Sequence, residues 1–496
     1  MRRVAGRGLL VCLTLAGAVS ATAQPVNWPR ENPPSPLPAR EVIFPPYEVR
    51  TLANGLPVVV VMHHEQPAVN LRLILRAGAA SDPRSKNGVA ALMGQLLDQG
   101  TTSRTATEIA ETVDSIGGII NVGVGTDLSF VNVLVLKDSF EFAADLLADV
   151  VRNPLFAPAE IERQRQQVLS GLQVSYDDPA YLAGVVFGRL VYGFHPYGMP
   201  HNGTPESVPG LTRDDLRAFH DTHFAPNNAL LAVVGDVDAE AAFAAVERVF
   251  GDWERKTLPP PPSAEMPPPT RRVIVIDKPG SVQTAIRVGQ VGLQRTSPDY
   301  LTYDVAIKIL GGEGGNRLGS VLRIERSLTY AASAEMASRR FGGDFMAKTD
   351  TRSDATAEAL RLIVDEVARL RRERVSRREL RNAQAYLAGS FPLTLETPNA
   401  IAAQVLESLL YGLDLDDLPT YPDRIDAVTV NDIQRVSRAY LQPQRLSIVL
   451  VGEASAFLDD LPGVGFDTVE VLSVDELDLM SADLRRSSTD DGNPRP

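Results

Sequence analysis

The sequence predicts an α+β protein with two homologous domains, each a mainly antiparallel sheet with helices on one face. The first observation is an internal repeat, in which residues 211–237 align without gaps to residues 428–454 at a constant offset of 217 positions. Each copy has the pattern of a capped helix, a proline-marked turn and an apolar strand that ends in glycine. The second is a proline-rich connector between the copies, residues 259–269. The third is that strand patterns precede helical patterns within each half.

These signals predict the domain boundaries. Proline-rich segments are extended and semi-rigid, so the connector separates two packed units. The acidic, serine-rich end of the chain, from about Val474, is typical of a mobile tail. The predicted organisation is a signal peptide (1–23), an extended proline-rich arm (24–46), an N-terminal domain (47–255), a linker (256–271), a C-terminal domain (272–455) and a C-terminal extension with an acidic mobile tail (456–496).

Residues 1–23 have the pattern of a secretory signal peptide. Arg2, Arg3 and Arg7 precede an apolar run, and small residues come before Gln24. The run is too short to span a bilayer as a permanent anchor. We therefore expect an exported, periplasmic protein without a membrane span.

Composition excludes several classes of partner and of stabilising bond. The chain of 496 residues has 49 Lys and Arg against 62 Asp and Glu, a formal net charge of −13. This balance disfavours nucleic acids and anionic membrane surfaces as partners. The single cysteine, Cys12, lies in the signal segment, so no disulfide is expected in the mature chain and its stability must come from core packing.

Residues 88–101 carry the frame of a zinc-peptidase motif without its zinc ligands. The stretch reads GVAALMGQLLDQGT, from Gly88 to Thr101. It resembles the helix of the pitrilysin and mitochondrial processing peptidase family, in which an H-x-x-E-H motif lies between a leading glycine and a closing Gly-Thr. In this alignment the histidine positions fall on Ala91 and Gln95, and the glutamate position falls on Gly94.

The resemblance also implies a third zinc ligand, a glutamate on a later helix. That position falls on Gly171. Histidines at i and i+4 share one helix face and can hold one Zn²⁺, and a catalytic site needs three protein ligands and an open position for water. The methyl group of Ala91, the carboxamide of Gln95 and the hydrogen atoms of Gly94 and Gly171 cannot replace the imidazoles and carboxylates of the motif. We therefore predict no metal site and no cofactor in this chain.

The second half contains a segment, residues 322–330, that resembles the family segment reaching into the zinc site. There an Arg and a Tyr stand seven residues apart, as Arg323 and Tyr330 do here. The resemblance implies that these side chains bind the peptide backbone and stabilise the oxyanion. A donor placed where negative charge develops contributes roughly 3 kcal/mol. Taken alone, the two residues would also fit a solvated helix position and a half-buried strand position.

A glycine-rich stretch, residues 311–318, lies just upstream. It lacks the G-K-[ST] ending of a phosphate-binding loop. The resemblance implies a flexible loop beside the cleft that helps to receive substrate, and a simple turn is the alternative. The substrate-binding candidates are Gly311, Gly312, Gly314 and Gly315.

Further matches support the family resemblance, which spans roughly residues 45–455. They include His195-Pro-Tyr-Gly198 and the segment from Pro226 to Asp236. Of the six histidines, only His220 and His223 have ligand-like i, i+3 spacing. Because no glutamate or cysteine nearby in sequence completes a shell, we predict a structural role for both.

The function predicted from these features is that of a non-catalytic subunit in a heterodimeric zinc metalloendopeptidase. A homologous partner with an intact motif would hold Zn²⁺, and this chain would supply Arg323 and Tyr330 for peptide or unfolded polypeptide substrates. The alternative is a peptide-binding or scaffolding protein with no role in catalysis. A relocated active site is a third possibility, for which no constellation of residues is found. Retention of the Arg/Tyr pair favours the first reading, because a scaffold has no need of it.

Overall fold

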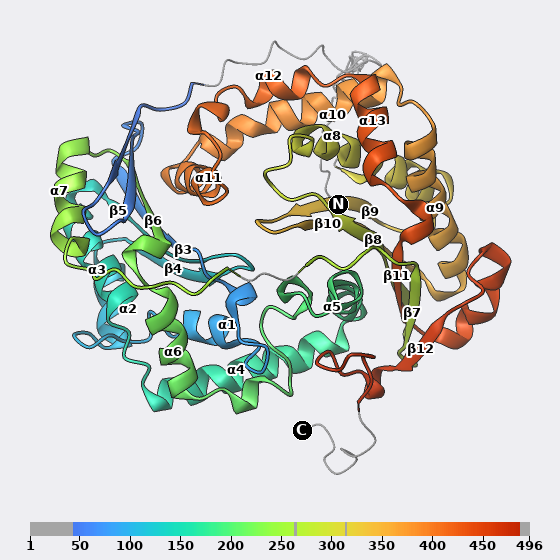
Figure 1. Ribbon diagram of the computed structural model, residues 1–496, viewed down its shortest axis with the longest axis horizontal. Coiled ribbons are helices and arrows are strands. Elements are labelled where there is room, and N and C mark those ends of the chain that lie inside the picture. Colours follow the sequence, from blue (N-terminus) through green and yellow to red (C-terminus); the bar gives the residue numbers. More distant parts are fainter. Residues whose placement is uncertain (1–42, 262–264, 313–314, 487–496) are drawn as a thin grey trace, which may run out of the picture. The chain divides into compact units, whose positions relative to one another are not determined.

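The computed structural model describes residues 43–261, 265–312 and 315–486 (Figure 1). The predicted signal peptide and nearly all of the predicted arm lie outside this range. Two six-stranded sheets organise the described chain, one in each half of the sequence. The predicted α+β fold class is confirmed.

The first sheet is mixed but mainly antiparallel. Its only parallel neighbours are β2 and β6, and the other neighbouring strands pair antiparallel. The strand order is β1 (Tyr47–Thr51), β2 (Pro57–Met62), β6 (Ala229–Gly235), β3 (Ala68–Leu75), β5 (Ser129–Leu136) and β4 (Ile119–Val124). The helices of this half are α1 (Val89–Gly94), α2 (Ala106–Ser115), α3 (Phe140–Arg152), α4 (Pro158–Asp177), α5 (Pro179–Tyr192), α6 (Arg213–His223) and α7 (Ala239–Phe250).

The second sheet repeats this plan with a different edge strand. β12 takes the edge position that β1 holds in the first sheet, but pairs parallel to its neighbour β7. The order is β12 (Glu470–Ser473), β7 (Arg272–Asp277), β11 (Ser447–Gly452), β8 (Gln283–Gly292), β10 (Gly343–Arg352) and β9 (Ala332–Ser338). The helices are α8 (Tyr300–Gly311), α9 (Thr356–Arg372), α10 (Arg377–Ser390), α11 (Pro398–Leu410), α12 (Tyr421–Asp426) and α13 (Val430–Tyr440).

The internal repeat corresponds to one helix–strand unit in each half. α6 and α13 both begin with a threonine cap whose hydroxyl accepts the N–H of an aspartate three residues later, and that aspartate reaches back to the cap. Such a capping box satisfies two backbone donors that a helix start leaves unpaired. The helices start 217 residues apart, at 213 and 430, and lead into β6 and β11, which occupy the same place in the two sheets. The repeat predicted from sequence is confirmed.

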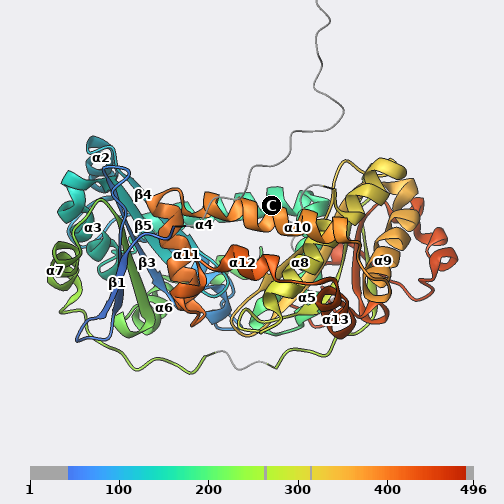
Figure 2. The same ribbon diagram turned by 90° about the horizontal axis from the view of Figure 1, so that it is seen from above.

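Each sheet has both faces covered, one of them by a helix from the other half. In β2 the side chains alternate between faces, and Val58 and Val60 join the core formed with the helices of their own half. Val59 and Val61 face the other way and pack in one cluster with Ile401 of α11. Both views show α11 beside the strands of the first sheet (Figures 1 and 2).

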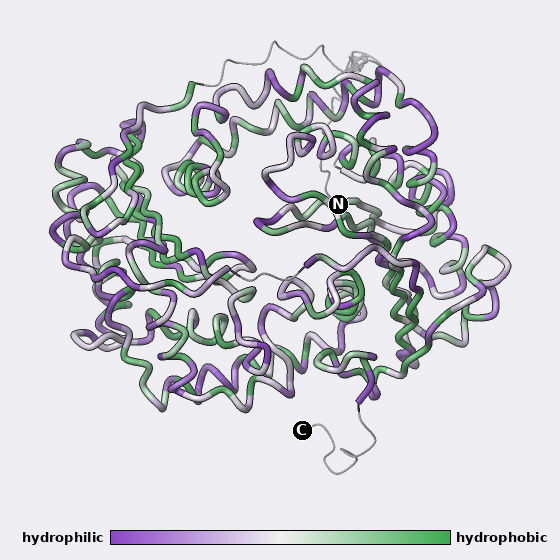
Figure 3. Tube along the Cα trace, viewed as in Figure 1, coloured by the Kyte–Doolittle hydropathy of each residue, from purple (hydrophilic) through white to green (hydrophobic). Residues whose placement is uncertain are grey.

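The second sheet is covered in the same reciprocal way. Ile274 and Val449 belong to one cluster with Leu182 and Val186 of α5, a helix of the first half. The colouring by hydropathy shows α5 and α11 as mainly hydrophobic segments (Figure 3). The prediction of helices on one face is therefore correct within each half, and the exchanged helices α5 and α11 cover the opposite faces.

The predicted mobile tail is wrong for residues 474–486. Strand β12 is followed by a short turn of 3₁₀-helix, and Leu477, Leu479 and Leu484 are buried against the α5 cluster. Burial of these leucines outweighs the acidic composition that suggested a solvated segment. The remaining residues, 487–496, lie outside the described range.

The linker has neither helix nor strand in residues 256–261 and 265–271, the parts that the structure describes. Its Met266 packs partly against the α5 cluster. Within the described ranges, no helix is both long and apolar enough to span a membrane.

Candidate functional site

Helix α1 positions the degenerate motif and is shorter than the motif frame. It begins after Gly88, whose φ of 93° lies in the left-handed region that favours glycine. The Asp82 carboxylate accepts the N–H groups of Gly88 at 2.7 Å and Ala90 at 3.0 Å, and so caps the helix. The helix ends at Gly94, and residues 95–99 continue as turns.

Three of the four degenerate positions meet at one cavity of about 610 Å³. Gly94 and Gln95 line it from α1, and Gly171 lines it from α4. Ala91 is buried in α1 and is not among the residues that line the cavity. Zinc needs nitrogen, sulfur or carboxylate donors, which hydrogen, methyl and carboxamide groups do not replace. The residues present at these positions therefore do not fit a Zn²⁺ ion.

The two glycines of this cavity differ in the space around them. A Cβ on Gly94 would lie 2.3 Å from Cγ2 of Val124 on β4, far inside van der Waals contact. A Cβ on Gly171 would have no heavy atom within 4 Å. A side chain at the glutamate position of the zinc motif therefore requires Val124 to move, whereas the third-ligand position is open.

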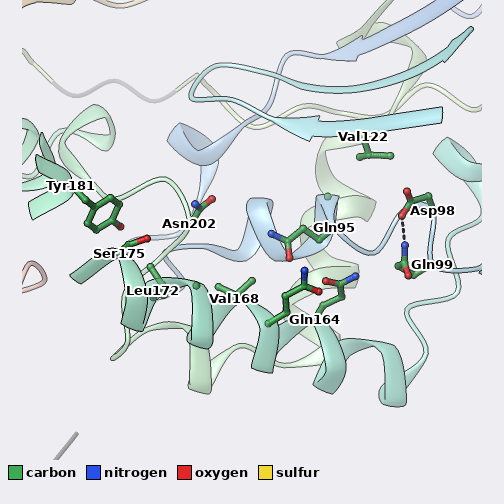
Figure 4. A pocket seen from close by; sticks show the side chains of 13 residues that line it. Gln95, Asp98, Gln99, Val122, Gln164, Val168, Leu172, Ser175, Tyr181 and Asn202 are labelled. Atoms are coloured by element: carbon green, nitrogen blue, oxygen red, sulfur yellow. Dashed lines mark hydrogen bonds between the residues drawn. The ribbon is translucent and has the colours of Figure 1, made fainter. Parts of the chain in front are cut away.

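The rest of the cavity wall is rich in carboxamides (Figure 4). Gln95 from α1 and Gln164 from α4 lie on facing sides of it, with Val122 of β4 above them. The Gln99 amide is held at both ends, since its Nε2 donates to Asp98 at 2.7 Å and its Oε1 accepts from Arg163 at 2.6 Å. These glutamines match no zinc-motif position except at Gln95, and the only signal for them in the sequence is their clustering in residues 95–99 and 164–167.

The Arg/Tyr segment is held in an uncommon backbone conformation. Arg323 lies on a π-helix, Gly319–Glu325, anchored by the buried Leu322. Ser327, between the two candidates, has a φ of 54°, and the Leu328 N–H donates to the Leu322 carbonyl at 2.8 Å. π-Helical turns are rare in proteins overall, and so are non-glycine residues in the left-handed region. Both features are concentrated at functional sites.

Arg323 and Tyr330 both point into solvent. The Tyr330 side chain is 89% exposed and lies outside β9, so the half-buried strand position considered for it is wrong. In the described part of the chain, neither side chain makes a hydrogen bond or an ion pair. Neither residue lines the cavity of the degenerate motif.

An ion pair between a buried arginine and a half-buried glutamate supports the start of this segment. Arg317, which is buried, donates from Nε to the Glu379 carboxylate at 2.7 Å, and Glu379 also caps α10 by accepting the Ser376 N–H at 2.7 Å. Burial acts to raise the pKa of Glu379, but these hydrogen bonds outweigh it and lower the pKa to about 2. The carboxylate therefore stays charged at neutral pH.

The glycine-rich stretch is only partly a loop. Gly311 is the buried last residue of α8, where a Cβ would lie 2.1 Å from the backbone nitrogen of Ala334 on β9. Gly312 ends the helix, so the prediction that both belong to a free loop is wrong, and close packing of α8 on β9 is the reason. Gly315 has open space around it, and Gly314 lies outside the described residues.

His220 and His223 have structural environments. The ring of His220 lies 2.9 Å from the Val151 carbonyl and stacks on Phe224 with centroids 4.4 Å apart. Burial lowers the pKa of both histidines. Among the described residues there is no group of three His, Cys, Asp or Glu side chains that could hold a metal ion.

Two family models match the chain along most of its folded length. The model described as "Insulinase (Peptidase family M16)" matches residues 58–188, and the model described as "Peptidase M16 inactive domain" matches residues 210–387. The chain belongs to peptidase family M16. The M16 match carries the degenerate motif in its first part and the Arg/Tyr pair in its second.

Relatives and solved structures agree with the M16 assignment. An "uncharacterized zinc protease" of Mycobacterium leprae is 27% identical over 82% of this chain and 92% of the relative. A protein with the same description from Bacillus subtilis is 24% identical over 78% and 94%. The crystal structure of a peptidase M16 inactive domain from Pseudomonas fluorescens is 29% identical, covers 82% of this chain and 98% of its own, and superposes with a TM-score of 0.76.

A second solved structure shows the fold alone. A protease from Helicobacter pylori has a TM-score of 0.76 at 22% identity, and the match covers 82% of this chain and all of that one. The M16 fold thus extends over both halves of the described chain.

Proposed function

We propose that this M16 chain is the non-catalytic, zinc-free subunit of a heterodimeric zinc metalloendopeptidase. A homologous chain with an intact H-x-x-E-H motif supplies the metal site, and this chain supplies Arg323 and Tyr330 to bind the peptide and stabilise the oxyanion. The observation that carries the proposal is a contrast within one molecule. The metal-binding positions have lost every ligand, while two polar side chains with the family spacing stand exposed on a strained segment.

The chemistry of the two side chains suits this role. Arg presents five N–H donors in a planar fork, and Tyr presents one hydroxyl donor on a rigid ring. Because neither is engaged within the described chain, both donors are free to meet a peptide carbonyl or an oxyanion. The exposed ring of Tyr330 makes little contact with its own domain, which favours a contact with substrate or partner over a packing role.

The proposed substrate is a peptide or an unfolded polypeptide segment. Strand β4 is an edge of the first sheet, and its Val122 lines the cavity. An extended peptide can add to such an edge through main-chain hydrogen bonds. We further propose a periplasmic location, on the basis of the signal-peptide pattern in residues 1–23.

The test uses the full chain mixed with the intact-motif M16 homologue of the same organism, with an unstructured, fluorogenic peptide as substrate. Tyr330→Phe removes a single hydroxyl and should lower kcat of the mixture about 100-fold, the usual cost of one oxyanion donor. Tyr386→Phe, at another exposed tyrosine on α10, is the matched control and should leave kcat unchanged. Size-exclusion chromatography checks that each variant still binds the homologue.

Arg323→Ala extends the test to peptide binding and should mainly raise KM. Its control is Arg326→Ala, three residues away on the same segment, where the guanidinium faces Glu358 at 3.6 Å. If the mixture cleaves peptide and is indifferent to both Tyr330→Phe and Arg323→Ala, the catalytic contribution is refuted and the scaffolding alternative is favoured.

A further inference from the structure

The cavity beside the degenerate motif is lined by uncharged hydrogen-bonding groups that its own domain does not use. Gln95, Gln164 and Gln167 contribute carboxamides, and Tyr181 contributes a hydroxyl. In the described part of the chain none of these four side chains makes a hydrogen bond. Their donors and acceptors are therefore available to a ligand.

Gln164 is the most informative of these residues. Only 8% of it is exposed, yet its amide has no partner among the described residues and borders the cavity from α4. The nitrogen and oxygen of this amide are not fully buried, so they border the cavity and can exchange water for the hydrogen bonds of a ligand.

The cavity wall carries one acidic residue and no basic one. Asp98 is the only ionisable carboxyl that lines it, and it already accepts a hydrogen bond from Gln99. No lysine, arginine or histidine is among the lining residues. Burial raises the pKa of Tyr181, so its hydroxyl keeps its proton and acts as a donor.

We propose that this cavity is a binding site for an uncharged peptide segment that presents a carboxamide side chain, Asn or Gln, to Gln95 and Gln164. A carboxamide offers two donors and two acceptor lone pairs, which match the mixed donors and acceptors of the wall. The volume of about 610 Å³ lies within the range of ordinary ligand pockets. This site lies outside the proposed catalytic role of the Arg/Tyr pair and needs neither a partner nor a metal.

The same wall discriminates against acidic ligands. A glutamate in place of glutamine would lose two donors and bring a carboxylate close to Asp98 without any cation to pair with it. Sites built on paired polar groups reject analogues that leave those groups unpaired.

The experiment uses the purified full chain alone, in a metal-free buffer. The probes are two fluorescein-labelled, C-amidated hexapeptides that differ only in a central Gln-Gln or Glu-Glu pair, and fluorescence anisotropy measures binding. The Gln-Gln peptide should bind at least tenfold more tightly than the Glu-Glu peptide. Equal affinities, or no binding of the Gln-Gln peptide at millimolar concentration, would overturn the proposal.

Gln164→Leu keeps the approximate volume of the side chain and removes its amide. It should weaken Gln-Gln binding about tenfold, which corresponds to one buried hydrogen bond. Gln166→Leu is the matched control, because Gln166 lies on the same helix but bonds Glu162 at 2.7 Å and does not line the cavity. Thermal unfolding checks that both variants are folded. If both variants bind like the parent chain, the ligand does not occupy this cavity, whatever the outcome of the peptidase mixture.

Discussion

Gly94 on α1 and Val124 on β4 pack so closely that any side chain in place of Gly94 requires the Val124 side chain to move. A Cβ on Gly94 would lie 2.3 Å from Val124 Cγ2. Both residues belong to or pack against the core of the first half, so the contact cannot relax freely. The site has therefore lost its ligands and has also been repacked around their absence.

This relationship predicts opposite effects of alanine at the two glycines of the cavity. Gly94→Ala should lower the free energy of unfolding by about 1–3 kcal/mol, the usual cost of overpacking. Gly171→Ala should raise it by about 1 kcal/mol, because alanine favours helix α4 and its methyl group meets nothing within 4 Å. Urea denaturation of the two variants measures both values.

Val124→Ala should rescue Gly94→Ala. In a double-mutant cycle the two changes couple, since the truncated side chain leaves space for the added methyl group. Independent, additive effects would show that the clash is absorbed elsewhere in the domain. The same logic predicts that Ala91→His, Gln95→His and Gly171→Glu together restore zinc binding, and that adding Gly94→Glu to them destabilises the chain unless Val124→Ala is also present, as measured by zinc content after dialysis and by urea denaturation.

The repeat made the fold predictable, but not the exchange of helices. Thr212 and Thr429 cap equivalent helices, and a capping pattern of this kind can be recognised in the sequence because its residues are neighbours along the chain. The pairing of α5 with the second sheet depends on contacts between residues over 250 positions apart, such as Val186 with Val449 in one cluster. An unbroken apolar run such as Val58–Val61 is typical of a strand buried on both faces, but it does not indicate which helix covers the second face.

At the candidate site, the residue types could be predicted from the sequence, but the backbone conformation and the burial of these residues could not. The motif spacing shows that zinc ligands are absent at Gln95 and Gly171, and the structure places both residues at one cavity. The conformation that holds Arg323, a π-helix followed by a left-handed serine, has no sequence signature of its own. The place of the Gln164 amide beside the cavity, without a hydrogen-bond partner among the described residues, is defined only by the folded chain.

The exchanged helix α5 should be essential for stability of the second half. Val186 is fully buried in the α5 cluster, so Val186→Asp places an unpaired carboxylate against the second sheet. It should destabilise the chain by more than about 3 kcal/mol. Val174→Asp, at an exposed position on the neighbouring helix α4, should change stability by less than about 0.5 kcal/mol. Near-equal melting temperatures for the two variants would contradict the exchange.

The Arg317–Glu379 pair should make the free energy of unfolding depend on pH in the acidic range. The pKa of Glu379 is lowered from its ordinary 4.5 to about 2, so its contribution is fully present above pH 4.5 and is lost as the pH falls towards 2. At pH 7, Glu379→Gln should cost about 2 kcal/mol, because Arg317 is left buried without its charged partner. The difference in the free energy of unfolding between parent and variant, measured by urea denaturation from pH 7 to pH 3, should shrink below pH 4.5.

The control is Glu358→Gln, which loosens the exposed pair with Arg326 and should cost less than about 0.5 kcal/mol. A pH-independent gap for Glu379→Gln would show that its carboxylate contributes by packing and not by charge.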